Sequence, residues 1–235
     1  MLTALLLAFA MNPPKPAITV ENRQAAGAQV QIVRIPLKDR TFRVSPIVAK
    51  SFPGGDEAAT AMVKRTGALA AVNGAYFSRT TLLPIGDVLV DGELIHSGRM
   101  GTALILSPDG TARIERVVRH KTMNWEGEET VLACGPQLVQ KGKKDVDPAA
   151  EGFRDPAIMG SIPRMGIGLT AGSELLFVHV RTRVSFEKMA EVFVALGCES
   201  ALNLDGGASL FLFANGKTLI PAGRKLPVLL GVFRR

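Results

Sequence analysis

The sequence feature that most constrains the fold lies at residues 201–213. The apolar run Ala-Leu-Asn-Leu leads into Asp205, and two glycines, Ala208 and Ser209 separate this acid from a second apolar run. A carboxylate at the end of a buried strand is costly to desolvate unless it has a partner. The glycines allow a tight turn that brings backbone N–H groups close to a ligand. The acid, the amides and the hydroxyl together predict a site for an oxyanion or a sugar.

A simple β-hairpin is the competing interpretation of the same residues. Asp-Gly between two apolar runs is a strong hairpin signal, and the acid would then only turn the chain. Taken by itself the stretch favours the hairpin, so the choice depends on the rest of the chain.

The remaining pattern predicts a β-rich α+β domain with a mixed or antiparallel sheet. Apolar and polar residues alternate over residues 17–50, and hairpin signals follow at 91–92 and 108–110. Helical spacing predicts two main helices, at residues 57–66 and 185–197. We expect one domain over residues 17–235, with a long surface loop at 141–161 of the kind that often carries function.

Residues 1–16 are expected to be a signal or leader segment. An apolar run at 1–10 precedes a proline-rich stretch and is too short to span a bilayer. It fits the apolar region and small-residue end of a secretory signal, although the basic first part is missing. We therefore expect an exported protein, whether periplasmic, secreted or envelope-associated. The alternative is a cytosolic protein with an apolar first strand.

The net charge of +7 indicates an anionic partner. The basic residues are scattered, apart from Lys141, Lys143 and Lys144, and the chain has a single Trp and a single Tyr. A nucleic-acid module usually shows a basic stripe with interleaved aromatic residues, so we expect no nucleic-acid binding. Association with an anionic envelope surface remains open.

Several common chemistries lack support in the sequence. The three histidines are far apart, and no Cys-x-x-Cys pair, P-loop or Gly-x-Ser-x-Gly elbow occurs. We therefore expect no metal site and no cofactor. Cys198 would act as a nucleophile only in a basic, partly exposed setting. Cys134 and Cys198 are read either as one disulfide or as two separate buried thiols.

Two further polar residues lie where strands meet turns. Asn73 follows a buried apolar run, and Arg164 opens a glycine-rich strand. A rigidly held arginine is suited to a bidentate grip on phosphate or carboxylate. The alternative for Arg164 is a surface cation beside a loop.

Four short segments, in order, resemble the motifs of the phosphodiester glycosidase family. Residues 73–77 read Asn-Gly-Ala-Tyr-Phe, where the family has Asn-Gly-Gly-Tyr/Phe-Phe. Residues 135–139, Gly-Pro-Gln-Leu-Val, are similar to its Gly-Pro-x-Leu-Val segment. Residues 163–168, Pro-Arg-Met-Gly-Ile-Gly, look like its Pro-Arg-Thr-Ala-Ile-Gly. Residues 202–209, Leu-Asn-Leu-Asp-Gly-Gly-Ala-Ser, resemble its Leu-Asn-Leu-Asp-Gly-Gly-Gly-Ser signature, and the resemblance covers roughly residues 30–235.

The resemblance implies an activity. The family includes the enzyme that removes N-acetylglucosamine from mannose-6-phosphate diesters. By this likeness the chain would hydrolyse the sugar C1–O bond of a small or polymer-linked sugar-1-phosphodiester, releasing free sugar and a phosphomonoester. Ala208 in place of a glycine, Leu210 in place of a second serine and Met165 in place of a threonine leave the choice of substrate open, as does the absence of the usual Asp-Gly-Arg at residues 179–183.

The acidity of the leaving group suggests which catalytic roles the motif residues have to fill. Glycosidases normally use two carboxylates, one of which protonates a poor leaving group. A phosphomonoester, with a second pKa of about 6, leaves far more easily, so one carboxylate and one cation suffice. We assign Asp205 as nucleophile or as base for water. Arg164, Ser209 and the amides of Gly206 and Gly207 are expected to hold the phosphate.

The residues of the first motif are expected to shape the substrate pocket. Asn73 and Gly74 would orient the sugar or the loop around it. Tyr76 and Phe77 would wall the pocket or stack on the sugar, although Phe77 is equally suited to the core. Candidates for a second carboxylate are Asp87, Asp91 and Glu199, each of which also reads as a turn or surface residue.

Two other classes of function compete with this hypothesis. One is a non-catalytic protein that binds envelope glycans or assists exopolysaccharide biosynthesis, with the same pocket. The other is a metal-dependent phosphodiesterase that cleaves the P–O bond, which would need clustered carboxylates or histidines that the sequence does not show.

Overall fold

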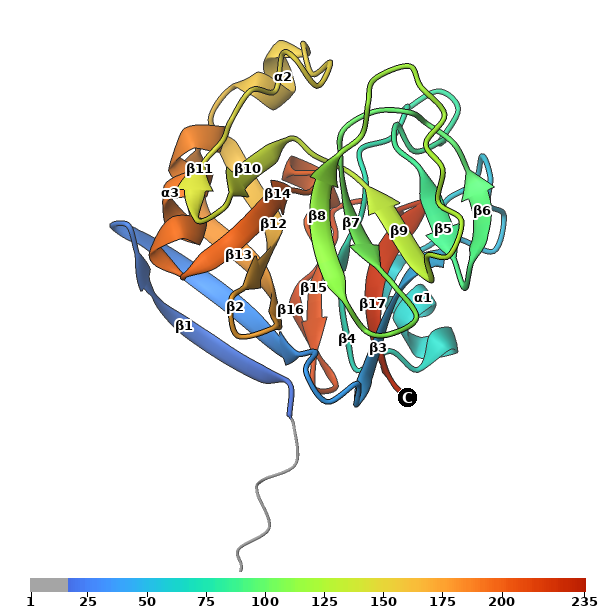
Figure 1. Cartoon of the computed structure of the whole chain (residues 1–235), viewed down its shortest axis with the longest axis horizontal. Helices are drawn as coiled ribbons and strands as arrows, with labels where there is room; N and C mark the ends of the chain where they lie inside the picture. Colours follow the sequence, from blue (N-terminus) through green and yellow to red (C-terminus); the bar gives the residue numbers. More distant parts are fainter. Residues whose placement is uncertain (1–16) are drawn as a thin grey trace, which may run out of the picture.

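The computed structural model describes residues 17–235, so the predicted leader at residues 1–16 lies outside the described residues. The described part folds as one α+β domain with three antiparallel sheets (Figure 1). The large sheet contains, in spatial order, β1 (Thr19–Ala25), β2 (Ala28–Pro36), β13 (Glu174–Val184), β12 (Ile162–Thr170), β14 (Cys198–Asn203), β10 (Gln137–Gln140) and β11 (Lys143–Lys144).

Two smaller sheets complete the domain. The second sheet contains β16 (Lys217–Ile220), β15 (Leu212–Ala214), β4 (Ala70–Asn73), β17 (Val228–Arg234) and β3 (Phe42–Val48). The third contains β6 (Glu93–His96), β5 (Val88–Val90), β9 (Thr130–Ala133), β7 (Thr102–Leu106) and β8 (Ala112–Arg116). The predicted α+β class is confirmed, and the pairings between named strands are all antiparallel.

The two predicted helices are present with slightly later starts. Helix α1 covers Ala59–Thr66 and ends at Gly67, whose φ of 69° is the left-handed conformation that glycine adopts easily. Helix α3 covers Phe186–Ala195, and the Ser185 side chain caps it by accepting a hydrogen bond from the Lys188 amide. A third, short helix, α2 (Pro156–Met159), forms inside the loop predicted at 141–161.

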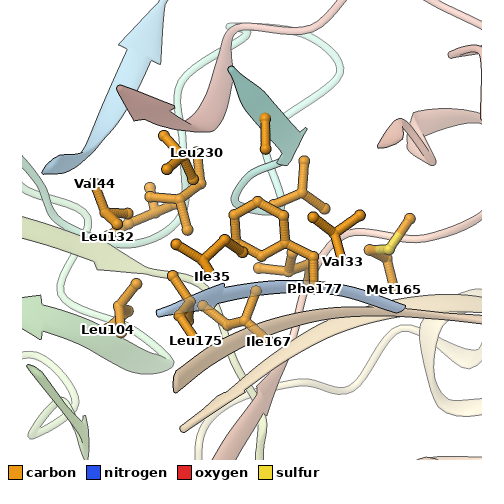
Figure 2. Packing of buried hydrophobic residues seen from close by; sticks show 14 of the residues in the cluster. Val33, Ile35, Val44, Leu104, Leu132, Met165, Ile167, Leu175, Phe177 and Leu230 are labelled. Carbon is orange, nitrogen blue, oxygen red and sulfur yellow. The ribbon is translucent and has the colours of Figure 1, made fainter. Parts of the chain in front are cut away.

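The inner faces of the three sheets share one apolar core. Figure 2 shows Phe177 of the large sheet in the same cluster as Leu230 of the second sheet and Leu104 of the third. Successive strand residues point to opposite faces, so β2 contributes Val33 to this core and Ile32 to a separate cluster under α3. Both faces of the large sheet are therefore buried, which makes it a rigid base for the loops at its edge.

The stretch at residues 201–213 is not a hairpin. Its first run belongs to β14 in the large sheet, whereas its second run enters β15 in the second sheet, where Leu212 lies opposite Val72 of β4. The segment between them passes from one sheet to the other and includes a short 3-10 turn at Gly207–Ser209. The hairpin interpretation is therefore wrong, and Asp205 lies at the junction of two sheets.

Candidate active site

Asp205 is fixed at the sheet junction by its backbone. Its N–H donates to the Gly74 carbonyl at 3.2 Å, and its own carbonyl accepts a hydrogen bond of 2.8 Å from the Asn73 side-chain amide. The Asn73 side-chain oxygen also accepts the Phe211 amide at 3.1 Å. Asn73 is buried, so it positions the Asp205 loop and does not reach the pocket. Gly74 is held close to Val228, where an added Cβ would lie 2.9 Å from the carbonyl oxygen.

The Asp205 carboxylate is buried but has an incomplete set of partners. One oxygen accepts the Gly206 amide at 2.8 Å, and the other accepts the Arg224 guanidinium at 3.0 Å. Burial raises the pKa of Asp205, while Ser209, Arg224 and the Gly206 amide offset part of this rise. The side chain therefore combines an elevated proton affinity with a charged neighbour.

Arg224 is the cation beside Asp205, and no sequence motif points to it. It lies between β16 and β17, donates from Nε to the Ser209 hydroxyl at 2.8 Å, and packs 4.8 Å from the centre of the Phe77 ring. These contacts fix the guanidinium in an orientation suited to a charge-assisted bond with an oxyanion. An arginine in the glycine-containing turn at 221–225 was the available signal, and it is a weak one.

Asp205 and Arg224 share a pocket with a volume of about 540 Å³. This is within the usual range for small-molecule sites, about 300–1,000 Å³. The lining comes from five segments of the chain: Tyr76, Phe77, Arg79 and Ile85; Met100; Gly152, Phe153, Arg154, Asp155, Ala157, Ile158 and Ile162; Asp205, Gly206, Gly207 and Ala208; and Arg224.

Gly206 and Gly207 both line this pocket, and they differ in their surroundings. Gly206 packs against the start of β12, where an added Cβ would lie 2.9 Å from Ile162 and 3.0 Å from the Pro163 carbonyl. Gly207 has a φ of 60° and faces open space. Ser209 is buried and bonded to Arg224, so it supports that guanidinium and is absent from the lining.

Tyr76 and Phe153 form one wall of the pocket. Their ring centres lie 5.3 Å apart, and the Tyr76 hydroxyl accepts a hydrogen bond of 2.8 Å from the Asn203 side chain. Phe153 belongs to the long loop at 141–161, which is anchored by the buried Glu151. The Glu151 carboxylate accepts the Thr102 hydroxyl at 2.7 Å. The loop is therefore built into the site.

Arg164 lies behind the pocket wall. It is fully buried and donates to the carbonyls of Val184 at 2.8 Å, Ile158 at 2.9 Å and Gly160 at 2.6 Å. Its guanidinium carbon sits 3.7 Å from the centre of the Phe186 ring, and burial lowers its pKa. These contacts tie α2 to the large sheet, and Arg164 is absent from the pocket lining, while its Nη1 atom has no hydrogen-bond partner within residues 17–235.

The candidate second carboxylates lie elsewhere. Asp87 is buried and accepts the Trp125 indole N–H at 2.8 Å, while Asp91 pairs with Arg43 at 2.6 Å and Glu199 is exposed. The pocket's other acid is Asp155, which caps α2 by accepting the Ala157 amide at 2.9 Å. The sequence indicated it only through the length of its loop.

The cysteines and histidines take no part in this site. Cys134 and Cys198 are buried free thiols, and burial raises the pKa of Cys198 to about 12, which leaves it protonated at neutral pH. Burial lowers the pKa of His179 to about 4. Within residues 17–235, no group of three or more His, Cys, Asp or Glu side chains is placed to hold a metal ion. None of the helices in that range is long and apolar enough to cross a membrane.

The chain belongs to the phosphodiester glycosidase family, whose sequence model matches residues 66–233. This match confirms the resemblance of the motifs and identifies the domain, at the level of the family, as a phosphodiester glycosidase-like hydrolase. A search of curated proteins finds no match to the sequence.

Solved structures show the same fold. The catalytic domain of zebrafish N-acetylglucosamine-1-phosphodiester alpha-N-acetylglucosaminidase, auto-inhibited by its pro-peptide, has a TM-score of 0.76 at 19% identity, over 95% of this chain and 85% of that chain. A hypothetical protein from Synechocystis has a TM-score of 0.70 at 16% identity. The match covers 93% of this chain but 62% of the Synechocystis chain. At these identities the likeness establishes the fold.

Proposed function

We propose that this protein hydrolyses the C1–O bond of a sugar-1-phosphodiester and releases a free sugar and a phosphomonoester. The observation that carries the proposal is the placement of Asp205 and Arg224, 3.0 Å apart, on the wall of one pocket. One group can deliver water to the sugar while the other receives the departing phosphate. The family to which the chain belongs supports the same reaction class.

The reaction divides between the two groups as follows. Asp205 takes a proton from water as the water attacks C1, or attacks C1 itself in a first step that water then completes. The electrons of the C1–O bond pass to the phosphate oxygen, which leaves as a phosphomonoester. Arg224 stabilises the charge that develops on this oxygen. The released phosphate needs little protonation, since its second pKa is about 6.

The rest of the pocket would hold the sugar and the phosphate. Tyr76 and Phe77 offer aromatic faces for the sugar, and the turn at Gly206 and Gly207 lies where its amides can meet phosphate oxygens. Ser209 would position Arg224, and Asn73 would position the backbone of Asp205, without touching the substrate. Arg164 would act indirectly, because its hydrogen bond to the Ile158 carbonyl holds α2 in place. The chain needs no second catalytic carboxylate in this scheme.

Product analysis on a panel of chromogenic sugar-1-phosphodiesters tests the proposal. Free sugar with a phosphomonoester is the expected outcome, and Asp205→Asn should remove it. Sugar-1-phosphate as the product would show P–O cleavage and refute the scheme. Binding without turnover across the panel would favour the non-catalytic glycan-binding or exopolysaccharide-accessory role. The anomeric configuration of the first-formed sugar, read by NMR, separates direct attack by Asp205, which retains configuration, from base catalysis, which inverts it.

The proposed setting of this reaction is outside the cytoplasm. The support is the apolar run at residues 1–10, followed by a proline-rich stretch, which reads as a secretory signal. Expression of the full chain with an epitope tag at its C-terminus, followed by fractionation, tests this. A cytosolic product of unchanged mass would refute export.

A further inference from the structure

The pocket carries more positive charge than a single phosphodiester requires. Three arginines line it: Arg79, Arg154 and Arg224. Arg224 already pairs with Asp205 and bonds Ser209, and it is the group placed for the scissile phosphate. Arg79 and Arg154 are exposed, and neither has a hydrogen-bond or ion-pair partner within residues 17–235. Asp155 is the remaining acid in the lining, and one of its carboxylate oxygens accepts a hydrogen bond from the Ala157 amide at the start of α2.

The backbones that carry these two arginines are held in place. Arg79 follows Phe77, which bridges Pro84 across its loop, and the Ser78 amide donates to the Leu83 carbonyl at 3.0 Å. Arg154 stands directly after Phe153, which is buried against Tyr76. A cation on a fixed backbone loses less conformational entropy on binding than one on a mobile tail, so the positions are suited to ligand contact.

The position of the Arg79 loop indicates which part of the ligand it meets. Phe77 of that loop packs against Arg224, the group placed for the phosphate, and Arg79, two residues further along, lines the same pocket. The alcohol component of the diester, the aglycone, continues from the phosphate away from the sugar. An acid on the aglycone would therefore enter the region that Arg79 and Arg154 flank.

We propose that Arg79 and Arg154 form a second anion subsite, and that the natural substrate is a sugar-1-phosphodiester whose aglycone carries at least one further acidic group. This inference rests on the proposed function for its substrate, but the subsite itself can be tested by binding alone. A chain of repeating phosphate esters and a small alcohol with a second phosphate both have the required chemistry. Guanidinium groups bind phosphate through charge-assisted, bidentate contacts.

Two matched ligands test the subsite. Propyl phosphate and propane-1,3-diol bisphosphate correspond to products with a neutral and an acidic aglycone. Calorimetry with the wild-type protein at low salt should show that the bisphosphate binds about tenfold more tightly. This preference should decrease as ionic strength rises, because exposed charges are screened. Equal affinities would overturn the proposal.

Substitutions assign the preference to the two arginines. The double variant Arg79→Gln/Arg154→Gln should bind both ligands with similar affinity and keep the wild-type affinity for propyl phosphate. Arg23→Gln, an exposed arginine on β1, removes the same kind of charge outside the pocket lining and should keep the preference. A double variant that keeps the wild-type preference would refute the assignment.

Turnover separates this inference from the proposed function. The sugar-1-phosphodiesters of propanol and of 3-phosphopropanol are offered to the same proteins. Preference in binding with no hydrolysis of either diester would support the subsite and refute the hydrolase. Hydrolysis of both at equal kcat/KM, with no preference in binding, would keep the hydrolase and refute the subsite. Hydrolysis with a kcat/KM about tenfold higher for the phosphorylated aglycone, lost in the double variant, supports both.

Discussion

Asp87 and Asp205 are both buried carboxylates beside short strands, and they differ in what surrounds them. Asp87 accepts hydrogen bonds from the Trp125 indole at 2.8 Å, the Gly98 and Arg99 amides at 2.9 Å each, and the Ser97 hydroxyl at 3.3 Å. Asp205 has one amide and one guanidinium, and it faces a pocket.

The difference separates a structural acid from a reactive one. Asp87 accepts from four donors and ties a loop to the third sheet, so it has little capacity to bind anything else. Asp205 retains lone pairs that can meet water or a sugar carbon. Arg164 and Arg224 repeat the contrast, because the first donates to three backbone carbonyls and the second to the side chains of Ser209 and the pocket acid Asp205. Burial alone therefore does not mark a functional charge.

The largest expected effect is that of the two acids on turnover. Asp205→Asn should lower kcat by at least about a thousandfold, because the group that activates water or attacks C1 is lost. Asp87→Asn should keep kcat near wild type. It should lower the free energy of unfolding by about 1–3 kcal/mol, since one buried hydrogen bond is lost. Steady-state kinetics and urea unfolding measure these effects. Loss of activity in a folded Asp87→Asn variant and normal activity in Asp205→Asn would reverse the contrast.

The two arginines should differ in the same direction. Arg224→Gln should lower kcat/KM by about a hundredfold, because the developing phosphate charge loses its cation. Arg164→Gln should instead lower the free energy of unfolding by about 3 kcal/mol, since buried carbonyls lose their donor and the contact with Phe186 is lost. Kinetics and denaturant unfolding are again the measurements. A folded, stable Arg164→Gln protein with the larger loss of kcat/KM would place Arg164 in the chemistry.

The pH dependence of the reaction should report the environment of Asp205. Burial raises the pKa of this acid, and it must be ionised to act, so the acid limb of kcat/KM should lie above the ordinary aspartate value of about 3.9. Arg224 lowers the pKa of Asp205, so Arg224→Gln should move the limb to higher pH. A limb at or below pH 4 in the wild type would show that ion pairing outweighs burial.

The smallest effect concerns stability. Because the pKa of Asp205 is raised on folding, its contribution to stability is complete below the unfolded pKa and is lost as pH rises through the folded pKa. Asp205→Asn should therefore melt at a higher temperature than wild type at pH 7, and the difference should disappear near pH 3. Calorimetry at the two pH values measures it. A lower melting temperature at pH 7 would show that the carboxylate stabilises the fold.

Much of the fold follows from local patterns in the sequence. Alternation located most strands, and the caps at Ser185 and Gly67 located both main helices, because such signals depend on neighbours along the chain. The hairpin interpretation of residues 201–213 failed because Asp-Gly turns the chain equally well between two sheets, and which strand β15 meets depends on β4, far away in sequence.

Only the site residues that belong to a sequence motif could be predicted. The motifs brought out Asp205, Tyr76 and the glycine turn, all of which line the pocket. Arg224 was missed because its partners belong to other elements and nothing near it in sequence indicates the contact. The prediction for Arg164 rests on a motif, which preserves a residue type without stating which way the side chain points, and Arg164 is absent from the pocket lining.

Hydrolysis in water enriched with ¹⁸O tests the central claim most directly. If Asp205 and Arg224 cleave the C1–O bond, mass spectrometry will find the label on the anomeric hydroxyl of the sugar and an unlabelled phosphomonoester. Label on phosphate, with sugar-1-phosphate as a product, would mean that water attacks phosphorus and would contradict the roles given to both residues.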